Sequence, residues 1–185
     1  MKAQLILAVV VLACGSLAPI ARAEEEVVIT FQDAEIGKPV PSWSAKGVTF
    51  EPGGTLRRGT AKPRIMFFPH LLTEKKGVLN AMANEAVPVL IRFPDGASKV
   101  TLVMWGSVTS TALVEALDQA GTVVNKASLE KVPKRDSPAK PIPSFELTVE
   151  ASRISSVRFS GAHPGGFLAA EEIRFVPLSV GKYHK

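Results

Sequence analysis

The side chains that could carry chemistry in this 185-residue sequence are few, and they form no enzyme motif. The histidines, His70, His163 and His184, stand in three separate segments. The sequence has no G-x-S-x-G, H-E-x-x-H or phosphate-binding loop pattern, each of which sets catalytic groups at a fixed spacing. Its 17 acidic residues show no spacing that singles out a catalytic pair. We therefore expect a protein that is not an enzyme.

The residues that suit ligand binding better stand in loop-like segments. Trp43 lies in the run PSWS, and a large aromatic in a Pro/Ser loop is suited to be an exposed platform for the apolar face of a sugar ring. The alternative is that Trp43 anchors its own loop. His163, in the run GAHPGG, is a second ligand-binding candidate, although this composition is also that of an ordinary turn.

Basic residues gather in two Gly/Pro-rich stretches. Arg57, Arg58 and Arg64 stand in the first, and four cations and four prolines occur in Lys131–Pro143, which we expect to be an extended loop. If the two stretches meet, they form a cationic surface for an acidic polysaccharide or cell-surface glycan. Otherwise they are solvated loops. With two Trp and one Tyr there is little platform for base stacking, so we expect no nucleic-acid partner.

The elements that must position these residues are short β-strands. Apolar-alternating runs recur about every ten residues between Gly, Pro, Asn and Asp, a pattern typical of an all-β sandwich. The predicted strands are Val27–Phe31, Gly47–Glu51, Ile65–Phe68, Val87–Phe93, Lys99–Trp105, Thr111–Leu117, Thr122–Leu129, Ser144–Val149, Ile154–Phe159 and Glu172–Val176. We expect a two-sheet antiparallel β-sandwich of the jelly-roll type. The turn residues at Pro94–Gly96 and at Asp118–Gly121 predict two hairpins.

The first 23 residues have the form of a signal peptide. Lys2 precedes the apolar run Leu5–Ala13, and Ala21–Ala23 is a small-x-small cleavage site. Removing the segment changes the net charge from +5 to 20 − 17 = +3 and removes the one cysteine, Cys14. We expect an exported protein, periplasmic or extracellular, with one domain at 24–180, a basic tail at 181–185 and no transmembrane anchor. Lipidation of Cys14 is the alternative.

Three stretches resemble the galactose-binding-like, carbohydrate-binding-module-like jelly rolls of secreted bacterial proteins. They are VVITFQDAEIGKPVPSWSAKGVTFEPGG, VLIRFPDGASKVTLVMWG with ALVEALDQAGTVVNKASL, and ISSVRFSGAHPGGFLAAEEIRF. The resemblance covers nearly the whole chain after the signal segment. It implies a non-catalytic domain that often binds carbohydrate and often holds a structural calcium ion between its first and last strands.

The resemblance implies calcium ligands at Asp33, Glu171 and Glu172. The family's closing strand usually begins with Asp-Asp or Asp-Asn, where this sequence has the longer Glu-Glu. Strand alternation places Glu171 on the core side with Ile173, so its carboxylate needs a partner such as calcium or a backbone amide. The alternative is that both glutamates are solvated or paired with arginine.

Together these features predict a secreted, non-catalytic binding module for a polysaccharide or cell-surface glycan. The alternative function is a structural or protein-interaction domain of the envelope. The sequence carries no feature that sets the oligomeric state.

Overall fold

The computed structural model describes residues 25–39, 44–54, 64–67, 76–79, 81–82, 86–106, 111–161 and 167–178. The described elements are all strands, and they are antiparallel wherever they pair. Their bounds are β1 (Val27–Thr30), β2 (Ser44–Ala45), β3 (Val48–Pro52), β4 (Arg64–Phe67), β5 (Lys76–Leu79), β6 (Ala81–Met82), β7 (Ala86–Val87), β8 (Val89–Gly106), β9 (Ala112–Leu117), β10 (Val123–Leu129), β11 (Phe145–Ser160) and β12 (Leu168–Pro177).

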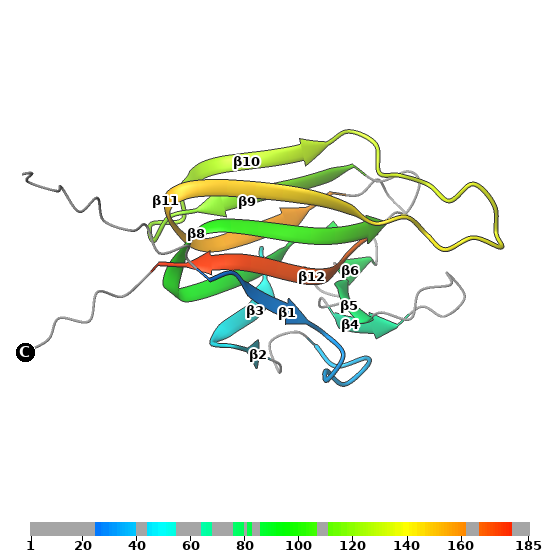
Figure 1. Cartoon of the computed structure of the whole chain (residues 1–185), viewed down its shortest axis with the longest axis horizontal. Coiled ribbons are helices and arrows are strands. Elements are labelled where there is room, and N and C mark those ends of the chain that lie inside the picture. Colours follow the sequence, from blue (N-terminus) through cyan, green and yellow to red (C-terminus); the bar gives the residue numbers. More distant parts are fainter. Residues whose placement is uncertain are drawn as a thin grey trace, which may run out of the picture.

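The strands form two packed layers that share β8 and β11. In the first layer, the second part of β11 and the first part of β8 pair with each other, with β9 and β10 on one side and β3 and β2 on the other. In the second layer, the first part of β11 pairs with the second part of β8, and this part of β8 pairs with β12. β12 also pairs with β1 and with β5, and β5 pairs with β4. This arrangement confirms the predicted antiparallel β-sandwich of the jelly-roll type (Figure 1).

The predicted hairpin at Pro94–Gly96 is wrong, because β8 runs unbroken through these residues. β11 likewise joins the two strands predicted at 144–149 and 154–159. The ladder between β8 and β11 shifts register between Glu150 and Ser156, so both strands bend there and pass into the other layer. Pro94 and Gly96, with a φ of +77° at Gly96, make a bend instead of a reversal. The second predicted turn, Asp118–Gly121, does join β9 to β10.

The core lies between the layers, where aromatic rings meet across the gap. Phe31, just after β1, contacts Phe50 of β3 edge-on with ring centroids 5.7 Å apart. Phe93 of β8 faces Phe175 of β12 at 5.0 Å. These contacts hold the layers together close to both ends of β1.

Two further features lie away from the core. β10 is an edge strand in which Val123 and Val124 are 41% and 44% exposed, and its pairing with β9 shifts register between Val123 and Asn125. The loop 130–144 projects from one end of the molecule, while both bends lie at the other end (Figure 1). The described residues include no helix long and apolar enough to cross a membrane.

Candidate functional site

A pocket of about 600 Å³ opens at the bent end of the sandwich. Its walls come from four places in the chain: residues 25–28 at the start of β1, residues 46–48 at the start of β3, the β8 bend at 93–96, and the end of β12 at Phe175 and Pro177. The bends of β8 and β11 bring these segments together, because they fold the first layer back over the second. This volume lies within the usual range of small-molecule sites.

The pocket has an apolar floor. Phe93 and Phe175 lie there with ring planes tilted by 54°, and they are only 3% and 6% exposed. Val27 and Val48 add aliphatic surface beside them. A ligand therefore meets apolar side chains but no open ring face for stacking. The two rings are fixed in position because they are part of the hydrophobic core.

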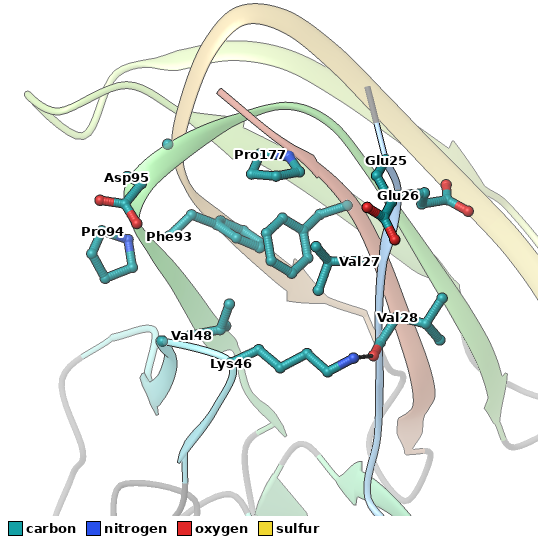
Figure 2. A pocket seen from close by; sticks show the side chains of 13 residues that line it. Glu25, Glu26, Val27, Val28, Lys46, Val48, Phe93, Pro94, Asp95 and Pro177 are labelled. Atoms are coloured by element: carbon teal, nitrogen blue, oxygen red, sulfur yellow. Dashed lines mark hydrogen bonds between the residues drawn. The ribbon is translucent and has the colours of Figure 1, made fainter. Parts of the chain in front are cut away.

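Carboxylates stand at the rim. Asp95 lies on one side of the Phe93 ring and Glu25 lies on the other, whereas the Glu26 carboxylate points away from the pocket (Figure 2). Carboxylate oxygens accept hydrogen bonds and take two hydroxyl groups side by side. The lining includes no histidine, cysteine or serine, so these residues form no Ser–His or Cys–His pair.

Lys46 forms the wall between Asp95 and Glu25. Ala45 pairs with Val48, so Lys46 and Gly47 make a two-residue turn between β2 and β3, and both have positive φ, +49° and +78°. This is the pattern of a type I′ turn, which matches the twist of the strands. The Lys46 Nζ donates to the carbonyl oxygen of Val28 at 2.7 Å and ties the turn to β1 (Figure 2).

Four of the ligand-binding residues predicted from the sequence, Trp43, Arg57, Arg58 and His163, lie outside the described residues. Trp43 immediately precedes β2, which leads into the pocket wall. Arg64 is exposed at the start of β4 and is not part of the pocket lining. The convergence of the two basic stretches therefore stays a prediction, and the pocket residues were missed because they come from four distant segments.

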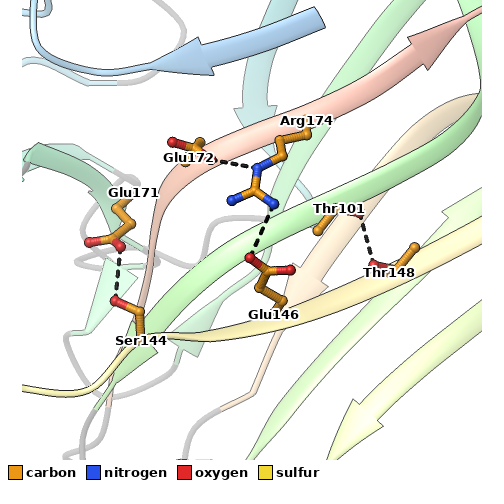
Figure 3. Close-up of polar contacts among 7 residues, drawn as sticks. All are labelled: Thr101, Ser144, Glu146, Thr148, Glu171, Glu172 and Arg174. Carbon is orange, nitrogen blue, oxygen red and sulfur yellow. Dashed lines mark hydrogen bonds and ion pairs between the residues drawn. The ribbon is translucent and has the colours of Figure 1, made fainter. Parts of the chain in front are cut away.

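The acidic residues predicted as calcium ligands have other partners or face solvent. Glu171 is 4% exposed, as the alternation predicts, and its Oε1 accepts a hydrogen bond from Ser144 Oγ at 2.8 Å (Figure 3). Glu172 accepts from Arg174 Nε at 2.6 Å, and Asp33 is exposed. Within the described part of the chain, no three acidic, histidine or cysteine side chains gather. This donor set does not fit calcium, which takes six to eight oxygens.

The outer face of the second layer carries a separate polar network. Arg174 also pairs with Glu146 at 3.1 Å, and Thr101 shares a hydrogen bond with Thr148 at 2.8 Å (Figure 3). The hydrogen bond to Glu172 is the largest cause that raises the pKa of Arg174 above its ordinary value. These groups are mutually satisfied across neighbouring strands, so they stabilise the sheet and leave the pocket as the better ligand site.

Comparison with known proteins gave structural neighbours only. No family model matches this chain, and no curated protein matches it. An arabinose-bound α-L-arabinofuranosidase aligns at 10% identity and a TM-score of 0.42, over 68% of this chain and 23% of the enzyme. This chain likewise spans only 20% of a bacteriophage CBA120 tailspike domain.

Two carbohydrate-binding modules align over most of their own length. TmCBM61 in complex with β-1,4-galactotriose shows 9% identity and a TM-score of 0.38, with 80% of this chain and 90% of the module covered. A family 29 module from Piromyces equi shows 11% identity and a TM-score of 0.38, with 70% and 91% covered. At these TM-scores the neighbours carry no argument about function, and the fold rests on this chain's own strand pairing.

Proposed function

We propose that this chain is a non-catalytic carbohydrate-binding module whose pocket at the bent end holds one or two units of a neutral glycan. The observation that carries the proposal is the pocket itself, with an apolar floor at Phe93 and Phe175 and carboxylates on opposite rims. A sugar has an apolar ring face and polar edges. The rim carboxylates match the polar edges, and the floor supplies apolar contact without a stacking platform. The resemblance of the sequence to galactose-binding-like domains supports the same class of ligand.

The charge of the pocket favours a neutral glycan over an acidic one. Glu25 and Asp95 contribute two negative charges, and Lys46 contributes one positive charge that is bonded to the Val28 carbonyl. An acidic sugar would meet like charges at the rim. An acidic polysaccharide would have to bind elsewhere, at the basic stretches that contain Arg57, Arg58 and Arg64.

The proposal also places the protein outside the cytoplasm, as a periplasmic or extracellular module. The form of residues 1–23 supports this location, with lipidation at Cys14 as the alternative. Trp43 remains our proposed aromatic platform, because it precedes the β2–β3 turn that forms one pocket wall.

Titration calorimetry with a ligand chosen from an array of neutral glycans tests the pocket. We expect Asp95→Ala and Glu25→Ala each to weaken binding about tenfold or more, because each removes a charged acceptor worth ~1.5 kcal/mol or more. Asp136→Ala is the matched control, since Asp136 is an exposed acid in the loop at the opposite end and pairs with Lys140, four residues further along the chain. Trp43→Ala is a separate arm that tests the platform.

Thermal unfolding of each variant shows that a loss of affinity does not reflect a loss of fold. Equal affinity of the wild type and both rim variants would remove the pocket from the proposal. If the wild type binds no glycan at all, the protein-interaction alternative becomes the better description.

A further inference from the structure

A lysine ammonium group binds the turn that follows β1. The Nζ of Lys76, the first residue of β5, lies 2.7 Å from the carbonyl oxygen of Gln32 and 2.7 Å from that of Ala34. An ammonium carries three donors and no acceptor, so two of its hydrogens are satisfied by these carbonyls. The contacts join parts of the chain that are more than 40 residues apart.

This turn lies where three strands meet. β12 pairs through Ala169 and Ala170 with β5, and through Glu172 with Thr30 of β1. Glu171 falls between these two pairings, at a bulge where the ladder of β12 with β8 shifts register. β1 and β5 therefore follow one another along the same edge of β12, and Lys76 closes the junction between them.

The junction has the chemistry of a cation site. Two backbone carbonyls converge on the Lys76 ammonium, while the carboxylates of the same turn face outward: Asp33 is exposed, and Glu35 pairs with Lys38 at 3.4 Å. Oxygen donors of this kind suit a hard cation. The sequence resemblance implies a calcium ion between the first and last strands, yet the predicted carboxylates face solvent or bond to Ser144 and Arg174.

We propose that the Lys76 ammonium is a built-in cation that takes the structural role of a metal ion at the junction of β1, β5 and β12. Its charge strengthens the hydrogen bonds to the two carbonyl oxygens and holds the turn against β5. The fold then needs no calcium, and the stability of this corner depends on Lys76.

Thermal unfolding of the wild type and of Lys76→Met, each in excess calcium and in excess EDTA, tests the proposal. We expect the wild-type Tm to be the same in both conditions. Lys76→Met keeps the length of the side chain and removes the charge, and we expect its Tm to fall by roughly 4–8 °C, as the loss of two charge-assisted hydrogen bonds predicts. Lys134→Met, at an exposed lysine in the 130–144 loop, is the matched control, and we expect it to leave Tm near the wild-type value.

Lys76→Arg gives a second variant, because a guanidinium can also donate to two carbonyls; it should recover more than half of the loss. A wild-type Tm that rises with calcium would overturn the proposal, since a ligand that binds only the folded state must raise Tm. So would a Lys76→Met variant as stable as Lys134→Met. If Lys76→Met does not fold, the calcium titration of the wild type and the Tm of Lys76→Arg decide the question.

Discussion

Lys46 forms a pocket wall although its backbone conformation is unfavourable for a residue with a side chain. Its φ of +49° lies in the left-handed region, where a side chain with a Cβ is disfavoured, and it is the one non-glycine residue with positive φ among those described. The hydrogen bond from Nζ to the Val28 carbonyl offsets part of this cost. A strained residue at a pocket rim is consistent with a binding role for that rim.

Comparison of Lys46→Gly with Lys46→Ala tests this strain. Both variants remove the hydrogen bond to Val28, and they differ only in the cost of a Cβ at positive φ. We expect Lys46→Gly to be more stable than Lys46→Ala by about 1 kcal/mol, as measured by urea unfolding. Equal stabilities would mean that the turn relaxes and that residue 46 is not strained.

Single residues also show which structural features local sequence can predict and which it cannot. The period of two along Glu171–Phe175 predicts that Glu171 is buried and Glu172 is not, because alternation is a local property. Ser144, which donates to Glu171, could not be predicted, since it lies 27 residues away. The same holds for Lys76, whose acceptors on the turn after β1 are set by the meeting of three strands.

The bends in β8 and β11 are the elements that make the pocket. Pro94, Asp95 and Gly96 have the composition of a hairpin turn, yet they serve as a bend inside an 18-residue strand. A bend within a strand and a reversal between two strands use the same residue types. The strands that pair on either side decide which of the two forms. Here β11 bends at the same place and keeps its pairing with both parts of β8.

Substitution of Gly96 tests the bend. Its φ is +77°, and an added Cβ would lie 3.0 Å from Leu178 Cδ1 and 3.5 Å from Arg153 side-chain atoms. We expect Gly96→Ala to cost about 1–2 kcal/mol in the free energy of unfolding, from the backbone conformation, and to weaken glycan binding through the displaced rim. Gly54→Ala, in open space with no positive φ, is the control and should stay within ~0.5 kcal/mol of the wild type. A Gly96→Ala protein as stable as this control would contradict the assigned strain.

At the scale of the whole molecule, the shared strands join the two layers into one unit. β8 and β11 each contribute hydrogen bonds to both layers, so neither layer can separate without breaking them. We expect a single unfolding transition, with equal calorimetric and van't Hoff enthalpies and coincident CD and tryptophan fluorescence curves. Two resolved transitions would show that the layers are independent.

The sequence was sufficient for the longer strand segments, the sandwich and the turn at Asp118–Gly121, because these follow from alternation and turn chemistry near each residue. It did not predict β2, β5, β6 or β7, nor that β8 and β11 each run through two predicted strands. It was insufficient for the pocket. Glu25, Lys46 and Asp95 share no local pattern, and only the two bends and the β2–β3 turn bring them to one place. Trp43 and the basic stretches remain predictions, because residues 40–43 and 55–63 lie outside the described ranges.

The shifted register of β10 affects how readily this protein aggregates with other chains. An edge strand with two exposed valines is a template on which another chain can add a strand, which is how many β-proteins aggregate. The irregular step between Val123 and Asn125 interrupts the regular spacing of donors and acceptors that such an addition needs, and the charge of Lys126 follows directly after it. This exposed edge of the sandwich is therefore poorly suited to self-association.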